Sequence, residues 1–109
     1  MENLMQMPVR YKITMSEQIP TGFGLYQNFP QTFYKITKIA FDLPIDLEVK
    51  LMIYDVFGRE VTVLVDDLLK AGSYEVKWNA SNVQPGIYYY KIKAGDFVDS
   101  KKMFLLNIN

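Results

Sequence analysis

The chain has 109 residues, with twelve acidic and twelve basic side chains and neither cysteine nor histidine. One domain with a single hydrophobic core is expected at this length. The composition excludes disulfides, thiolate nucleophiles, cysteine-based zinc fingers and serine–histidine catalysis, and the balanced charge differs from the basic footprint of a nucleic-acid binder.

The first 24 residues are expected to form an N-terminal extension with one strand. Residues 1–6 lack the charged and then apolar pattern of a secretory signal peptide, so such a signal is expected outside this chain if the protein is exported. Residues 9–15, from Val9 to Met15, alternate apolar and polar side chains, which predicts a half-buried strand. No apolar run approaches the roughly 20 residues of a membrane-spanning helix.

Short alternating segments make up most of the remaining chain. They predict strands at residues 38–43, 47–54, 60–65, 74–78, 86–93 and 97–106. Alternation sends Tyr88 and Tyr90 to one face of their strand and Tyr89 to the other. We therefore expect this aromatic set, with Trp78, to contribute to the core rather than to form a sugar-stacking platform.

Four glycines are expected at the turns between these strands: Gly58, Gly72, Gly86 and Gly95. Gly58 suits the positive φ that ends a type I turn with a bulge, and Gly95 closes the last hairpin in a similar way. Residues 66–72 are the one stretch expected to form a helical turn, which Gly72 would end. The spacing of strands and turns predicts an all-β, antiparallel sandwich of about seven or eight strands.

From Leu25 onward the chain carries a series of motifs in a fixed order. They lie at residues 27–33 (Gln27-Asn28-Phe29-Pro30 and then Phe33), 39–44, 54–61, 71–80, 85–92 and 95–106. In this order and spacing the chain resembles the C-terminal sorting domain of proteins exported by the type IX secretion system of the Bacteroidetes and related phyla. The resemblance implies an immunoglobulin-like fold over residues 25–109. The immunoglobulin-like domain of flagellar hook-capping proteins is a similar family, but the Lys101-Lys102-Met103 ending favours the sorting domain.

One loop departs from the family pattern. The usual Asn-Pro-Phe-Asn-Pro-Ser is replaced by residues 31–36, which contain no proline. We expect this loop to extend toward the following strand, with Tyr34 and Ile36 adding apolar surface.

The resemblance implies a function in export. It predicts that an upstream cargo is directed through the type IX translocon to the cell surface or medium, and that a sortase-like protease removes the domain. The domain would be the substrate of that chemistry, with no catalytic activity and no cofactor. The alternative is a structural or adhesive surface module, which self-associates by exchange of the strand at residues 9–15.

Five side chains are candidates for recognition by the export machinery: Arg59, Glu60, Lys101, Lys102 and Met103. The two lysines interrupt the alternation of the last strand and are candidates for contact with the translocon or with an acidic glycolipid. The alternative is that adjacent lysines protect an edge strand from pairing with neighbours. Arg59 and Glu60 are alternatively expected to form a solvated cross-strand pair beside the turn at Gly58.

The carboxylates suggest little chemistry. Asp55, Asp66, Asp67, Asp96 and Asp99 could serve calcium in pairs, but they lack the dense spacing of a calcium-binding loop. A hydrolase with paired carboxylates needs a cleft, for which a small sandwich has little room.

Overall fold

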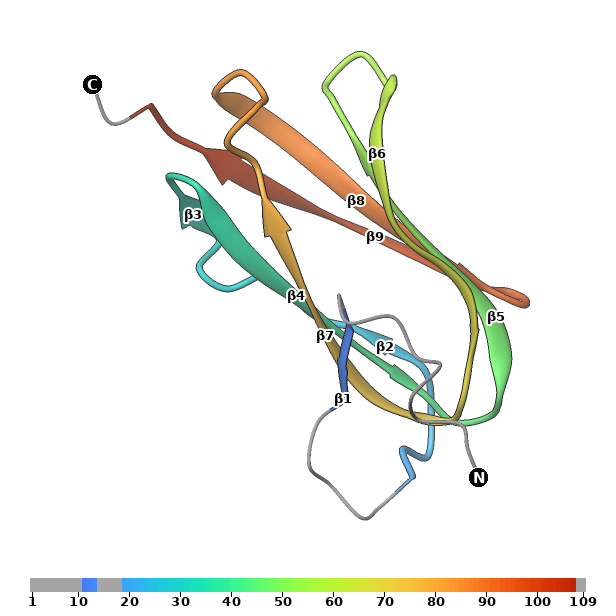
Figure 1. Ribbon diagram of the computed structural model, residues 1–109. Helices are drawn as coiled ribbons and strands as arrows, with labels where there is room; N and C mark the ends of the chain where they lie inside the picture. The colour runs from blue at the N-terminus through green and yellow to red at the C-terminus, as the bar shows by residue number, and fades with distance from the viewer. Residues whose placement is uncertain (1–10, 14–18, 108–109) are drawn as a thin grey trace.

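The computed structural model describes residues 11–13 and 19–107, in which nine strands form two sheets (Figure 1). The strands are β1 (Tyr11–Ile13), β2 (Gly24–Leu25), β3 (Thr32–Phe33), β4 (Ile36–Leu43), β5 (Leu47–Tyr54), β6 (Glu60–Leu69), β7 (Gly72–Asn79), β8 (Gly86–Ala94) and β9 (Phe97–Leu105). The predicted all-β sandwich is confirmed. The structure has one or two more strands than the expected seven or eight because β2 and β3, of two residues each, are too short to show an alternating pattern in the sequence.

The sheets have four and five strands. The first, sheet A, has the order β1-β7-β4-β2, and the second, sheet B, has the order β3-β9-β8-β5-β6. Neighbouring strands are antiparallel except β3 and β9, which run parallel. The chain crosses between the sheets after β2, β3, β4, β6 and β7, so both sheets are needed to complete one core (Figure 1).

The core fills the space between the inner faces of the sheets. Ile39, Phe41 and Leu43 point inward at every second position of β4 and are 0% exposed. The predicted alternation in β8 is confirmed, since Tyr88 and Tyr90 are buried while Tyr89 is on the other face. Trp78 is also buried, and its ring makes an edge contact with Tyr88, with ring centroids 5.6 Å apart.

The predicted helical turn at residues 66–72 is wrong. Residues 66–69 continue β6, and Gly72 is the first residue of β7. Val65 and Leu69 are both buried, and the backbone between them pairs with β5. A helix would also place these two side chains on one face, but it would give up the hydrogen bonds to β5.

Part of the segment before Leu25 belongs to the sandwich. β1 pairs with β7 in the register Tyr11 opposite Val76, so the predicted strand at residues 9–15 is present where the structure describes it. The other positions of that prediction lie outside the described residues. Phe23 stacks on Phe97 of β9, with ring centroids 4.9 Å apart. No helix in the described residues is long and apolar enough to cross a membrane.

Candidate recognition site

Residues 27–33, here called the opening segment, are anchored by the buried side chain of Asn28. Asn28 is 2% exposed, and its Nδ2 donates hydrogen bonds to the Pro30 carbonyl and to Thr37 Oγ1, both at 2.9 Å. Its Oδ1 accepts a hydrogen bond of 2.7 Å from Gln27. An amide in this position satisfies backbone groups that an irregular segment would otherwise leave unpaired. The Asn28 amide thereby fixes the path of the opening segment beside β4.

The hydroxyl of Tyr90 joins the same segment to sheet B. It donates to the Tyr26 carbonyl and accepts from the Asn28 backbone N–H, both at 2.7 Å. The ring of Tyr90 is 0% exposed, and burial raises the pKa of its hydroxyl to about 12. The hydrogen bond to the Tyr26 carbonyl therefore requires the protonated hydroxyl, which the raised pKa maintains inside the sandwich.

The opening segment also closes on the last strand. Gln27 Nε2 donates to the carbonyl of Lys102 at 2.8 Å, and Gln31 Nε2 lies 3.5 Å from the same oxygen. Farther along, the N–H of Phe104 donates to the Gln31 carbonyl at 3.1 Å. The edge of β9 is thus occupied from Lys102 to its end by the opening segment and β3.

The three candidate residues of β9 lie in different surroundings. Met103 is 0% exposed and packs in the core, so a folded domain does not present its side chain to a partner. Lys101 shares the inner face with Tyr90 and lies 4.0 Å from the Asp99 carboxylate. Lys102 is exposed on the outer face, directly opposite Tyr89. Because the Lys102 carbonyl is already capped, its side chain is not needed to protect that part of the edge.

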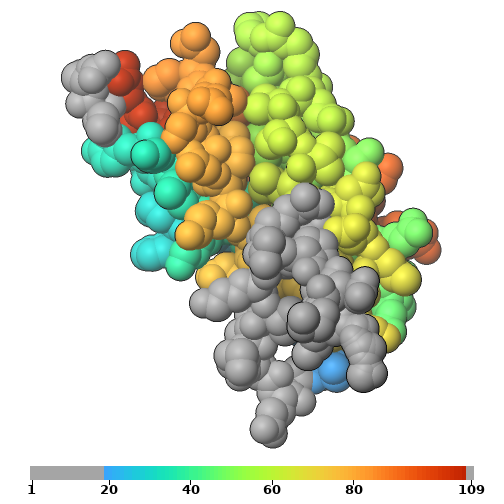
Figure 2. All heavy atoms as spheres, viewed as in Figure 1, coloured from blue at the N-terminus to red at the C-terminus, as the bar shows by residue number. Residues whose placement is uncertain are grey.

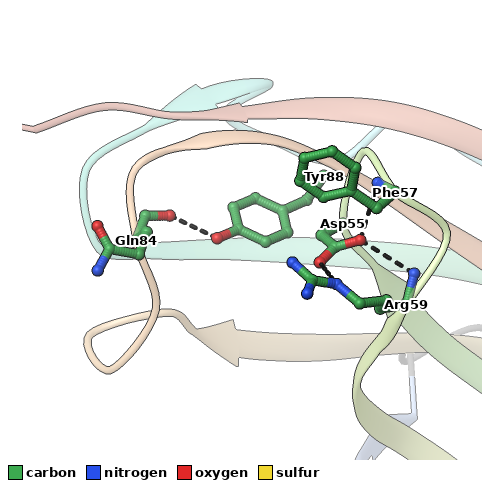
Figure 3. A network of polar contacts seen from close by, with 5 residues as sticks. All are labelled: Asp55, Phe57, Arg59, Gln84 and Tyr88. Atoms are coloured by element: carbon green, nitrogen blue, oxygen red, sulfur yellow. Dashed lines mark hydrogen bonds and ion pairs between the residues drawn. The ribbon is translucent and has the colours of Figure 1, made fainter.

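The turn between β5 and β6 is a rigid projection at the top of the molecule, light green in Figure 2. Gly58 has φ +80°, as the predicted turn requires, and its N–H donates to the Asp55 carbonyl at 3.0 Å. The Asp55 carboxylate accepts hydrogen bonds from the backbone N–H groups of Phe57 and Arg59, at 2.9 and 3.0 Å (Figure 3). These contacts fix the turn from both sides. Gly95, with φ +60°, plays the corresponding part between β8 and β9.

The predicted pair of Arg59 with Glu60 is wrong. Arg59 Nε instead donates to Asp55 Oδ2 at 2.9 Å, and its guanidinium lies 5.0 Å from the centre of the Phe57 ring (Figure 3). Adjacent residues of a strand point to opposite faces, whereas the carboxylate of the turn lies within reach. Desolvation raises the pKa of Asp55, but the hydrogen bonds from Arg59 and Phe57 outweigh it and hold that pKa below its usual range.

The register of sheet B brings two of the candidates into one row. Glu60 lies opposite Tyr54, Tyr54 opposite Tyr89, and Tyr89 opposite Lys102. Residues opposite each other in neighbouring strands share a face, so these four side chains cross the outer face of sheet B. Arg59, Lys101 and Met103 are not in this row. Tyr54 is not among the predicted site residues, and Tyr89 is predicted only as a member of an aromatic set. Their place in the row depends on strand pairing, which the alternation within a single strand does not define.

The described residues contain no group of three or more acidic side chains that could hold a metal ion. Gly72 and Gly86 begin β7 and β8 and are not part of the row or of the projecting turn.

Comparison with known protein families identifies the family of this chain. The family model described as the secretion system C-terminal sorting domain matches residues 29–106, which is more than half of the chain. The chain belongs to this family. Sorting domains of this kind are C-terminal signals for type IX secretion, so the predicted family and the predicted sorting function are confirmed over the adhesive alternative. A comparison with curated proteins gave no match.

A sorting domain implies export across the outer membrane, to the cell surface or the medium, by the type IX machinery. A family of sorting signals is not a catalytic family. In this sorting domain, the first matched motif is the opening segment and the last is β9, and the hydrogen bonds of Gln27 and Gln31 join them.

Proposed function

We propose that residues 25–109 act as a folded export signal for a cargo domain upstream, and that residues 1–24 are an extension of it. The type IX translocon recognises the assembled sandwich, and a sortase-like protease then releases the cargo at the cell surface. The domain is the substrate of these steps and performs no reaction of its own. It uses no cofactor.

The observation that supports this proposal is the contact between the two ends of the matched region. Within this region the opening segment accepts hydrogen bonds at its Gln31 carbonyl from the Phe104 N–H, at 3.1 Å, and at its Phe33 carbonyl from the Leu106 N–H, at 2.8 Å. Phe33 of the same segment is 2% exposed and packs against Trp78, with ring centroids 5.9 Å apart. Motifs separated by some 70 positions therefore depend on one another, which favours recognition of a folded surface over recognition of a linear tag.

We propose that the surface read by the machinery includes Arg59 and Glu60 at the projecting turn and Lys101 and Lys102 on the last strand. Met103 contributes through the core, by holding β9 in place. Two of these side chains have a carboxylate partner in the fold. Arg59 Nε lies 2.9 Å from Asp55 Oδ2, and Lys101 Nζ lies 4.0 Å from Asp99 Oδ2.

The test is a fusion of residues 1–109, and separately of 25–109, to a secreted fluorescent reporter in a host with a type IX system. We expect surface or medium delivery of both fusions. A matched host without the translocon should retain both in the periplasm. Periplasmic retention of both fusions in the competent host would refute the proposal, and retention of the shorter fusion alone would move the domain boundary.

We also propose that the strand at residues 9–15 can be exchanged between two copies of the chain. β1 pairs with residues Tyr74–Val76 of β7 in its own chain, and the same pairing is available to a second copy. Light scattering after size exclusion at high concentration should then detect a dimer. A strictly monomeric chain would contradict this part of the proposal.

A further inference from the structure

The outer face of sheet B combines two tyrosines with four lysines. The set, here called the tyrosine–lysine face, consists of Lys50, Tyr54, Tyr89, Lys91, Lys93 and Lys102. Its members lie on three neighbouring strands, with Tyr54 opposite Tyr89 and Lys50 opposite Lys93. The inner positions between them, such as Ile53 and Tyr90, are 0% exposed, so the set faces away from the core.

Lys91, Lys93 and Lys102 have no carboxylate opposite them in the strands that pair with theirs, whereas Lys50 lies opposite Asp66 of β6. Lys38, Arg59, Lys70 and Lys101 each lie within 4.0 Å of a carboxylate. Among the described residues, no carboxylate lies at that distance from any of the four lysines of the tyrosine–lysine face. Two lysines directly opposite each other repel, which costs stability. Glu48, Glu60 and Asp66 lie on β5 and β6 of the same outer face, so its positive charge is concentrated on β8 and β9, at Lys91, Lys93 and Lys102.

The centre of the face has the character of a protein-binding surface. Lys91 Nζ lies 5.8 Å from the centre of the Tyr54 ring, and the Tyr54 hydroxyl contacts Met52 Sδ at 3.2 Å, which fixes the ring. A shallow hollow of about 460 Å³ adjoins it, lined by Tyr54, Val56, Tyr89 and Lys91 together with Asp55, Gly58 and Ser100, and the Asp55 carboxylate in it is held by Arg59. Phe57, at the tip of the projecting turn, is 77% exposed. Aromatic side chains at the centre with charges around them are typical of protein interfaces.

We propose that the tyrosine–lysine face docks an acidic surface of a protein of the export machinery. The inference rests on the proposed function and deepens it by naming the face and the charge of the partner. Lys91, Lys93 and Lys102 favour a partner surface rich in Asp and Glu, and Tyr54, Tyr89 and Phe57 accept its apolar side chains. A pleated face with only a shallow hollow suits a broad protein surface, since small ligands bind in deep pockets. Lys102 is the recognition candidate that belongs to the face.

The experiment uses residues 1–109 and compares two charge reversals. The first variant combines Lys93→Glu and Lys102→Glu, which are both exposed on the tyrosine–lysine face. The control combines Lys38→Glu and Lys77→Glu, which lie opposite each other on sheet A. A neutralising variant, Lys91→Gln with Lys102→Gln, repeats the test with less risk to folding. Urea denaturation of all four proteins identifies any variant that is destabilised.

Binding is measured with poly-L-glutamate as the acidic probe, at low and at high salt, and export with the fluorescent fusion. We expect the face variants to bind the probe at least about tenfold more weakly than wild type and to lose export, while the control keeps both. Equal loss in face variants and control would overturn the proposal, as would normal export of folded face variants. A wild-type preference for dextran sulfate over poly-L-glutamate would also overturn it, in favour of an acidic glycan. Failure of the wild-type fusion to be exported would instead refute the proposed function.

Discussion

Replacing Tyr90 by phenylalanine tests the link between the opening segment and sheet B. The ring stays in the core, but the Asn28 N–H loses its acceptor and the Tyr26 carbonyl loses its donor. A buried polar group left unpaired costs about 1–3 kcal/mol, so two of them predict a loss of about 2–6 kcal/mol in the free energy of unfolding at pH 7. For a domain of this size the melting temperature should fall by roughly 10–30 °C.

The same hydroxyl gives the prediction a pH dependence of defined sign. Burial raises the pKa of Tyr90 to about 12, so between pH 10 and 12 the folded protein keeps a proton that the unfolded chain releases. The stability that this group contributes is fully present below pH ~10 and is lost as the pH rises, by about 1.4 kcal/mol per pH unit in that window. Tyr90→Phe lacks the hydroxyl, so its deficit relative to wild type should shrink by about 1 kcal/mol between pH 10 and 11.

Urea denaturation followed by the fluorescence of Trp78, the one tryptophan, measures both quantities at pH 7, 10 and 11. Burial also raises the pKa of Tyr74 and Tyr88, which lowers stability at alkaline pH in both proteins, so the difference between wild type and variant is the informative quantity. A deficit below about 0.5 kcal/mol at pH 7, or one that stays constant up to pH 11, would refute the reasoning.

Three further predictions concern the opening segment and the projecting turn. Asn28→Asp keeps the shape of the side chain but replaces the Nδ2 donor with a buried negative charge that faces the Pro30 carbonyl. Urea denaturation should show a loss of about 3 kcal/mol in the free energy of unfolding at pH 7. The loss should be smaller at acid pH, where the protonated carboxyl can again donate a hydrogen bond. Gly58→Ala places a side chain at φ +80° and should cost about 1–2 kcal/mol, whereas Gly22→Ala, which has open space and no positive φ, should be nearly neutral; equal losses would contradict the argument from backbone strain. Asp55→Ala should lower the hydrogen-exchange protection of the Arg59 amide while that of Leu51 is kept, and unchanged protection at Arg59 would show that the carboxylate does not hold the turn. Because the pKa of Asp55 is lowered in the fold, the support it gives the turn in wild type is present above the usual range of an Asp and is lost as the pH falls through its folded pKa.

Local pattern was sufficient for the strands but not for the parts that depend on distant partners. Alternation predicted the burial of Tyr88 and Tyr90 because the direction of a side chain in a strand depends only on its place in that strand. Val65 and Leu69 are four residues apart, and that spacing gives one face in a helix and in a strand alike. Pairing with β5 decides between them, and it is not visible in residues 66–72 themselves.

The site required still longer-range information. In the sequence, Asn28 is typical of a turn residue. In the structure it is buried, and its backbone N–H donates to the hydroxyl of Tyr90, which is 62 positions away. The row from Glu60 to Lys102 depends on the registers of three strand pairs, one of which contains irregularities near Leu51 and Ile53. The family resemblance indicated the function, but the positions of its motifs in space came only from the structure.

The place of β9 between β8 and β3 has a consequence for protein synthesis. This strand leaves the ribosome after the others, and it carries Met103 and Leu105 into a core that β4, β5 and β8 have otherwise lined. Long-range contacts of this kind cannot form until translation of the domain is almost finished. A product that stops before Phe97 therefore has no complete sandwich, and under the proposed function the export machinery would not recognise it.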